Sequence, residues 1–199
     1  MIFFADKCFN VITSTAEEDH PISKTDERYM GENVWKYATD NAKLKANDVF
    51  QRINKTDFPN LKEKFMVIGS DTIVTYNGEI FGKPKDKEDA KRILKRLSGK
   101  SHSVISGVVV ILNYNPKDET QNKLESEFYA ETEVEFDNLD DDVIDAYVAT
   151  GEPMDKAGGY GIQAIGGTLV KKINGDYYNV VGFPLNLFCS NIRKIYKND

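Results

Sequence analysis

The stretch GEPMDKAGGYGIQ at positions 151–163 constrains this chain more than any other part of its sequence. Glycines and a proline occupy five of its positions, so side chains are absent where the backbone must bend or let another group approach closely. Asp155 and Lys156 are adjacent within it. This composition suits a phosphate-bearing ligand or a metal. The alternative is a surface loop between a helix and a strand, with both charges solvated.

The composition predicts one cytoplasmic domain that spans residues 1–199. No apolar run approaches the roughly 20 residues of a membrane helix, and the first residues are too short and too charged a stretch for a secretory signal. We therefore expect no membrane partner. The net charge of −6 argues against binding of nucleic acid, which needs clustered Lys and Arg. Any phosphate site must then be local.

The cysteines and histidines show no metal-ligand spacing. Cys8 and Cys189 lie far apart without a CxxC pattern, so we expect buried free thiols rather than a zinc site or a redox pair. His20 and His102 share no ligand spacing with each other or with the cysteines. We expect each histidine in a loop or at a strand edge, without a chemical role.

The most strand-like segment, residues 65–74, carries an acidic residue. Its nearly continuous apolar character predicts burial on both faces of a sheet, but Asp71 interrupts it. A carboxylate there is costly unless it is paired, hydrogen-bonded or metal-bound, so Asp71 is a functional candidate. The alternative is an Asp that caps a turn at the end of the strand. Asn77-Gly78 then predicts a hairpin, whose return could bring Lys83 near Asp71.

The remaining patterns predict a mixed α/β order. Helices are expected at about 31–49, from the N-cap Asp86 to Gly99, at 140–149, and from Pro184 onward, where a closing helix would pack apolar residues that include Tyr196 on the sheet. Further strands are expected at 9–13, 104–114, 128–136 and 168–173, and a second hairpin at Asn174-Gly175 would return through a strand at 177–181.

Five segments together resemble the Maf-like nucleotide pyrophosphatases. They are GSDTIV at 69–74, GKP at 82–84, LSG at 97–99, DKAGGYGIQ at 155–163 and VGFPL at 181–185, and they follow the order and spacing of the family. The resemblance runs from about Phe9 to the C-terminus. The sequence is similar to animal members, including the Maf-like half of a fusion that also carries an acetylserotonin methyltransferase-like domain.

This resemblance implies an elongated α/β fold, with helices flanking a mixed sheet and a cleft between two lobes, related to the inosine triphosphatases. It also implies cleavage of a nucleoside triphosphate between the α and β phosphates with a divalent metal cation, Mg²⁺ or Mn²⁺, and a possible homodimer. Asp71-Thr72 and Gln163 match the branch similar to dTTP/UTP pyrophosphatases.

The resemblance also implies roles for individual residues. Asp71 would be the base or a metal ligand, and Glu18 a second carboxylate that could share the metal. Cations would offset charge on the phosphate oxygens, and Thr72 and Gln163 would contact the edge of the base. The full set of expected site residues is Glu18, Lys43, Asp71, Thr72, Lys83, Asp155, Lys156 and Gln163.

One family feature has no match. Family members open with a strand, a Ser-x-Ser-Pro-Arg-Arg turn and a helix, and no part of this sequence matches the turn. Either the sequence as given begins after that segment, which is our expectation, or this member has lost it. The second case favours a rival interpretation, a non-catalytic nucleotide-binding or regulatory protein. Retention of Asp71, Lys83, Asp155, Lys156 and Gln163 favours an enzyme.

Overall fold

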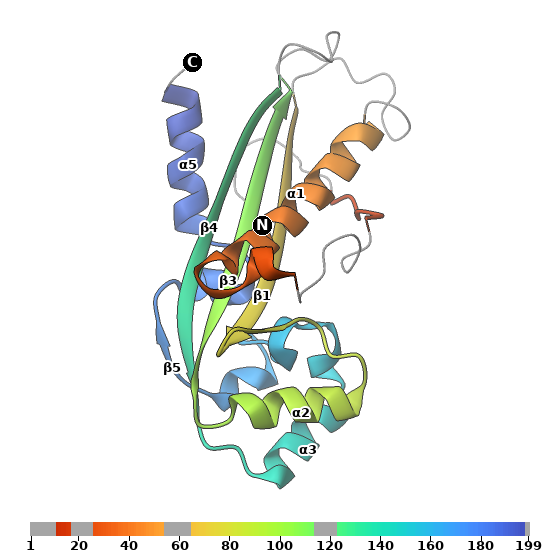
Figure 1. The fold of residues 1–199 in the computed structure, drawn as a ribbon, viewed down its shortest axis with the longest axis vertical. Coiled ribbons are helices and arrows are strands. Elements are labelled where there is room, and N and C mark those ends of the chain that lie inside the picture. Colours follow the sequence, from red (N-terminus) through yellow and green to blue (C-terminus); the bar gives the residue numbers. More distant parts are fainter. Residues whose placement is uncertain (1–10, 17–25, 54–64, 114–122, 198–199) are drawn as a thin grey trace.

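The computed structural model describes residues 11–16, 26–53, 65–113 and 123–197. Within them a five-stranded sheet, in the order β2-β1-β3-β4-β5, runs along an elongated molecule flanked by helices (Figure 1). This confirms the α/β class. The sheet is not mixed in this part of the chain, because every described pair of neighbouring strands is antiparallel.

The sheet contains three long strands and two short ones. They are β1 (Phe65–Tyr76), β2 (Glu79–Phe81), β3 (Ser101–Asn113), β4 (Lys123–Phe136) and β5 (Val170–Asn174). The hairpin predicted between β1 and β2 is confirmed. Asn77 and Gly78 have φ values of 49° and 77°, the left-handed conformation that a two-residue hairpin turn requires, and Tyr76 pairs with Glu79.

Five helices accompany the sheet in the described residues. They are α1 (Trp35–Arg52), α2 (Lys87–Leu97), α3 (Asp141–Ala149), α4 (Tyr177–Val181) and α5 (Leu185–Lys197). The predicted cap of α2 is confirmed, because the Asp86 carboxylate accepts a hydrogen bond from the backbone N–H of Asp89 at 2.8 Å. None of the described helices is both long and apolar enough to cross a lipid bilayer.

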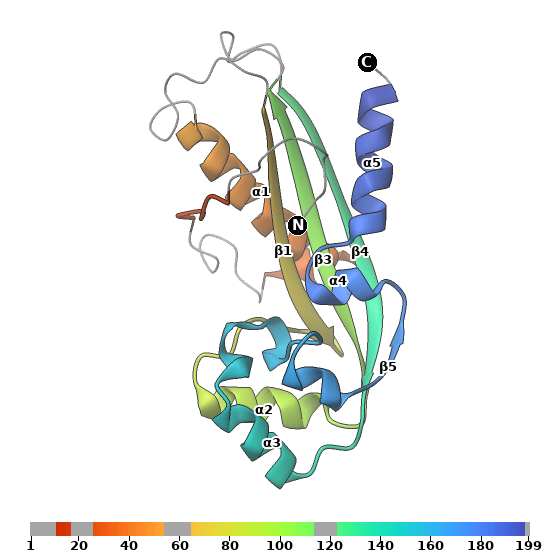
Figure 2. The same cartoon turned by 180° about the vertical axis from the view of Figure 1, so that it is seen from behind.

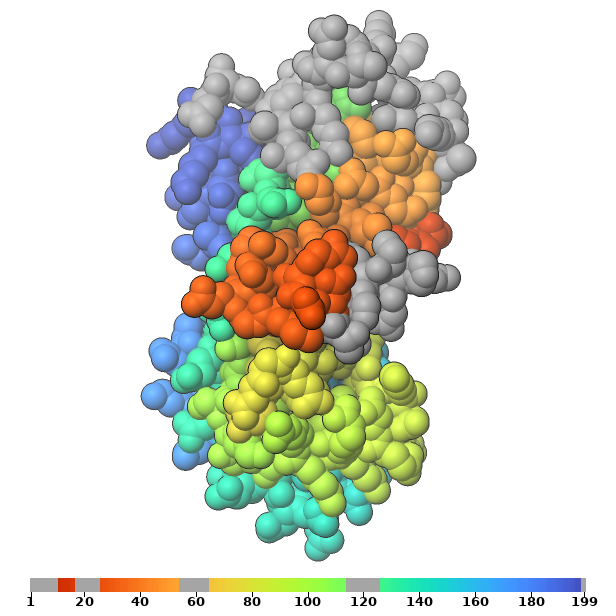
Figure 3. Space-filling model, viewed as in Figure 1, coloured from red at the N-terminus to blue at the C-terminus, as the bar shows by residue number. Residues whose placement is uncertain are grey.

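Two lobes share the sheet. In the first lobe, α1 and α5 cover opposite faces of the sheet (Figures 1 and 2). Alternate residues of β3 point to opposite faces, so Val109 and Ile111 pack with α1 while Val108 and Val110 pack with α5. The second lobe surrounds the other end of the sheet with α2, α3 and short 3₁₀ turns, and it has its own apolar cluster. The space-filling view shows the segment that leads into α1 lying directly against the β1–β2 region (Figure 3).

Helix α1 lies unusually close to the sheet because two glycines face it. An ideal Cβ at Gly69 would lie 2.3 Å from the carbonyl oxygen of Ala42, and one at Gly107 would lie 2.5 Å from the carbonyl carbon of Ala38. Either contact would force something to move. Gly107 is also the register partner of Asp71 across the β1–β3 pair, so this close approach brings α1 beside Asp71.

Two expected strands are not strands. Residues 11–13 have no regular secondary structure, and residues 9–10 lie outside the described part of the chain. Residues 177–181 form α4, because the Asp176 carboxylate accepts a hydrogen bond from the N–H of Tyr178 at 2.8 Å and caps a helix. The fully buried Asn179 then fixes this helix by donating to the carbonyl of Val104 at 2.9 Å. The run of β-formers in this segment was misleading.

Three side chains differ in burial from the prediction. Cys189 is free and exposed on α5, so it is not a buried thiol, and Cys8 lies outside the described residues. Tyr196, on the outer side of α5, is 58% exposed and does not pack on the sheet. His102 is only 3% exposed within β3, while His20 lies outside the described residues. For each described side chain, its burial depends on whether it lies on the face of its helix or strand that packs against the core.

We predict that Gly107→Ala lowers the free energy of unfolding by about 1–3 kcal/mol, because the new methyl group overlaps the backbone of α1. Urea denaturation of the variant and the wild type measures this. Gly151→Ala is the control: its Cβ would meet nothing within 4 Å, and its cost is confined to left-handed backbone strain. NMR shifts of Asn41 and Lys45 should move only in Gly107→Ala. Equal stability of Gly107→Ala and wild type would show that α1 can move away from the sheet without loss of stability.

Candidate active site

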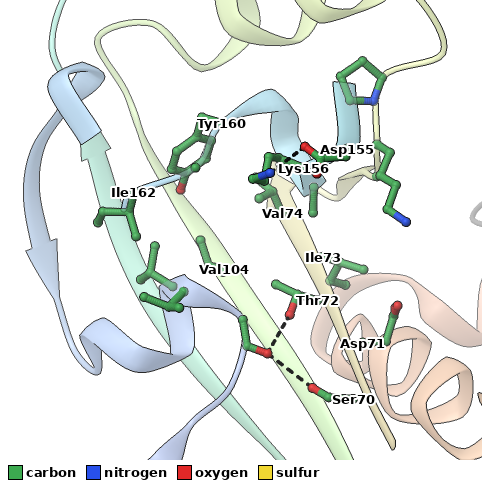
Figure 4. Close-up of a pocket in the computed structure, with 18 of the residues that line it drawn as sticks. Ser70, Asp71, Thr72, Ile73, Val74, Val104, Asp155, Lys156, Tyr160 and Ile162 are labelled. Carbon is green, nitrogen blue, oxygen red and sulfur yellow. Dashed lines mark hydrogen bonds and ion pairs between the residues drawn. The ribbon is translucent and has the colours of Figure 1, made fainter. Parts of the chain in front are cut away.

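A cavity of about 560 Å³ lies where the two lobes meet (Figure 4). Strand β1 forms its floor with residues 70–74, and α1 contributes one wall. The return of the first hairpin, the glycine-rich stretch and the end of α4 complete it. The cleft expected between two lobes is therefore present, and it collects side chains that are far apart in the sequence.

Asp71 is held by two side chains of α1. The ammonium of Lys45 lies 2.7 Å from Oδ1, and the amide nitrogen of Asn41 donates to Oδ2 at 3.3 Å. Both charged side chains of this ion pair are mostly buried. A buried carboxylate needs such compensation. The compensation that the sequence analysis required of a carboxylate in this apolar strand is present, and it comes from α1.

The structure places Lys43 elsewhere. Its ammonium lies 3.3 Å from a carboxylate oxygen of Glu127 on β4, in a solvent-exposed ion pair, and Lys43 does not line the cavity. Residues two apart on a helix point about 200° apart, so only one of Lys43 and Lys45 can face Asp71. The helical spacing of the sequence could have identified Lys45. Tyr37, Asn41 and Lys45 follow one another at intervals of four residues, so they share one face of α1, and all three line the cavity.

Lys83, Asp155 and Lys156 meet at the same cavity. Lys156 forms an ion pair with its neighbour Asp155, and this contact, helped by the charge of Lys83, lowers the pKa of the Asp155 carboxyl. The described lining contains four lysines, at 45, 83, 85 and 156, against two aspartates. The cavity is thus locally positive in a chain whose net charge is −6. It can attract a polyphosphate.

Thr72 points to the opposite side of β1 from Asp71, as adjacent strand residues must (Figure 4). Its hydroxyl lies 2.9 Å from that of Ser106, and Ser106 donates to the carbonyl of Asn179. Thr72 also lies within 3.4 Å of the Gly182 carbonyl, to which Ser70 donates as well. The donor of Thr72 is therefore used inside the protein. Only its lone pairs remain for the ligand that we expected it to contact.

Gln163 and Glu18 are the two remaining residues of the expected site. Gln163 is exposed and lines the cavity between Ile162 and Ala164, so the structure brings it together with Asp71, Lys83 and Lys156. Glu18 lies outside the described residues. Its expected role as a second carboxylate therefore stays a prediction.

Tyr160 forms part of the cavity wall and is braced from behind by His102. The hydroxyl of Tyr160 lies 2.8 Å from Nε2 of His102, and both rings pack edge-on against Phe136. Burial raises the pKa of Tyr160 and lowers the pKa of His102 to about 4. His102 is therefore neutral at pH 7 and acts as a core residue, not as the strand-edge residue that we expected.

The cavity thus combines a mostly buried carboxylate, paired with Lys45, and three further lysines between two lobes of an α/β protein. The chain belongs to the Maf-like protein family, whose sequence profile it matches over residues 6–195. The family resemblance inferred from the motifs is thus confirmed.

Curated proteins of this family are similar to the chain. It is 51% identical over 160 residues to the human "Probable bifunctional dTTP/UTP pyrophosphatase/methyltransferase protein", covering 80% of this chain but only 25% of that protein. It is 47% identical over 150 residues to the dTTP/UTP pyrophosphatase of Clostridium novyi, covering 75% and 71% of the two chains. With the dTTP/UTP pyrophosphatase of Thermococcus kodakarensis it shares 43% identity over 180 residues, 90% and 81% of the two chains.

We predict that His102 makes the protein less stable in mild acid. The folded state holds its pKa near 4, whereas the unfolded chain has an ordinary value of 6.5. The unfolded state therefore gains a proton first as the pH falls from about 6.5 towards 4, and stability is lost over that window at up to roughly 1.4 kcal/mol per pH unit.

Urea denaturation at pH 7 and pH 5 measures this loss. His102→Gln, which keeps a polar partner for Tyr160 but cannot titrate, is the matched variant. Between the two pH values the wild type should lose about 1–2 kcal/mol more than the variant. Identical pH profiles would show that His102 titrates normally in the folded protein.

Proposed function

We propose that this chain is a nucleoside triphosphate pyrophosphatase that hydrolyses dTTP and UTP, or modified pyrimidine nucleotides, to the monophosphate and pyrophosphate. Such an enzyme would remove unwanted nucleotides from the cellular pool. The names of the relatives support the substrate class. The observation that carries the proposal for this chain is the cavity in which Lys45 and Asn41 hold Asp71 beside further lysines.

The cavity residues suit transfer of the nucleotidyl group of a nucleoside triphosphate to water. The water oxygen would bond to the α-phosphorus while the bond from that phosphorus to the oxygen bridging the α and β phosphates breaks. Asp71 would orient the water and accept its proton. Lys83 and Lys156 would offset negative charge on the phosphate oxygens as pyrophosphate leaves. Gln163 would hydrogen-bond the base and favour bases that complete that pattern.

The described residues fit a divalent cation that the substrate helps to hold. No three His, Cys, Asp or Glu side chains gather into a metal-binding group in the described ranges. The cavity does offer Asp71, and beside it the Oδ1 of Asn41, which is buried and has no hydrogen-bond partner there. Mg²⁺ commonly uses one or two carboxylates and takes its other ligands from water and phosphates. Bound there, Mg²⁺ or Mn²⁺ would neutralise phosphate charge.

The proposal includes the setting in which the enzyme acts. The substrate is a free nucleoside triphosphate, and the net charge of −6 supports the absence of a nucleic-acid partner. We expect the protein in the cytoplasm, without a membrane partner, and as the homodimer that the family suggests.

Asp71→Asn should lower pyrophosphate release from UTP and dTTP, with Mg²⁺ or Mn²⁺ present, by about 100-fold or more, the scale of a lost acid–base group. Binding of a non-hydrolysable UTP analogue should persist. Asp141→Asn, which changes an exposed carboxylate paired with Lys95, is the control and should keep wild-type turnover. Near-normal turnover in Asp71→Asn would remove Asp71 from the mechanism. A wild type that binds the analogue without releasing pyrophosphate would support the non-catalytic alternative.

Lys43 and Lys45 provide a matched pair on one helix. Lys45→Met should reduce kcat/KM for UTP by about 30-fold or more, because it removes a charged partner of Asp71 inside the cavity. Lys43→Met should change kcat/KM less than about twofold, since its pair with Glu127 is exposed. Steady-state kinetics on the two purified variants measure this difference. Equal losses in both would contradict the assignment of Lys45 over Lys43.

A further inference from the structure

The loop of residues 161–166, which carries Gln163, is held by a carboxylate outside the cavity. Glu152 accepts a hydrogen bond from the N–H of Gly166 at 2.8 Å through Oε1 and one from the N–H of Ile165 at 3.0 Å through Oε2. Both oxygens are therefore used on adjacent backbone donors. This contact fixes the far end of the loop.

Tyr147 of α3 fixes the near end of the same loop. Its hydroxyl donates to Oε1 of Glu152 at 3.0 Å and accepts from the N–H of Gly161 at 3.3 Å. Tyr147 is itself 3% exposed, and burial is the main cause that raises the pKa of its hydroxyl, which keeps the donor in place. One carboxylate–phenol pair thus joins both ends of the loop to α3.

The loop ends approach this pair as closely as glycine allows. An ideal Cβ at Gly166 would lie 2.5 Å from the Tyr147 hydroxyl and 2.8 Å from the backbone nitrogen of Gly161. A side chain at Gly166 would therefore push apart the groups that make the hydrogen bonds. Gly166 therefore allows the hydrogen bonds of the Glu152–Tyr147 pair, which we call the brace, to form.

Between the two fixed ends, Ile162, Gln163 and Ala164 line the cavity (Figure 4 labels Ile162). Gln163, Ala164 and Ile165 are exposed, so packing against a core contributes little to their position. Glu152 and Tyr147 do not line the cavity. Glu152 and Tyr147 can therefore affect ligand binding only indirectly, through the conformation of the loop.

We propose that Glu152 and Tyr147 are positioning residues that set the nucleotide preference of the cavity by holding Gln163 in place. The inference rests on the proposed function, because it assigns the cavity to a nucleotide. Without the brace, ordering of the loop would have to accompany each binding event, and this would weaken binding. Loss of the brace should therefore affect affinity and base preference more than the chemical step.

The test uses Glu152→Gln and Tyr147→Phe. A Gln cannot accept on its nitrogen, so one backbone N–H loses its partner; a Phe lacks the hydroxyl that Glu152 and Gly161 share. Each variant should raise KM for UTP about tenfold, with kcat changed less than about threefold, and should lower the ratio of UTP to ATP hydrolysis. The double variant should lose less than the product of the single effects, because both residues belong to one network.

Amide hydrogen exchange and UMP binding provide readouts that do not depend on turnover. Exchange at Gly161, Ile165 and Gly166 should accelerate by about tenfold or more in both variants, with UMP affinity reduced in parallel. Glu135→Gln, which changes a carboxylate paired with Lys171, and Tyr196→Phe, on the exposed side of α5, are the controls. Neither control should change any of these quantities.

Unchanged amide hydrogen exchange in both variants would show that Glu152 and Tyr147 do not hold the loop, and would overturn the proposal. Faster exchange with equal losses of kcat and kcat/KM, together with an unchanged UTP to ATP ratio, would show a general structural role and overturn the proposal. If the wild type releases no pyrophosphate, the proposed function fails, while exchange and UMP affinity still decide whether the brace positions a nucleotide site. A wild type that does not bind UMP would overturn both.

Discussion

The close packing of α1 on the sheet is the constraint on which the site depends. Gly69 and Gly107 leave no side chain between helix and strands, so the helix backbone lies against them. At this short distance Lys45 and Asn41 reach Asp71 from one side of α1. A larger residue at either glycine would displace the helix and, with it, the partners that make a buried carboxylate tolerable.

Both lobes contribute residues to the cavity. The first lobe supplies Asp71 with its partners, and the second supplies Lys83, Lys156 and the loop that carries Gln163. The cavity lies at their meeting point, where a positive potential forms within an acidic protein. A nucleoside triphosphate that spans the two lobes would have its phosphates near the lysines and its base near the loop.

Predictions from neighbouring residues had mixed outcomes, since the hairpin expected at Asn174-Gly175 is wrong: a helix and not a return strand follows it. The Asn77-Gly78 hairpin and the Asp86 cap are confirmed because both are decided by contacts within a few residues. The segment 177–181 was wrongly expected to be a strand, since its residues favour strands while the cap Asp176 and the buried Asn179 favour a helix. A local cap and a distant hydrogen bond outweighed propensity there.

Fixed residue types at fixed spacing were enough to predict the family, the hairpin at Asn77-Gly78 and most of the expected residues that line the cavity. Three features became visible only in the folded chain: which lysine of α1 faces Asp71, the use of the Thr72 donor inside the protein, and the hold of Glu152 and Tyr147 on the loop beside the cavity. The physical reason is that these contacts join side chains from different elements. Their partners follow from the faces that the packed helices and strands present to one another.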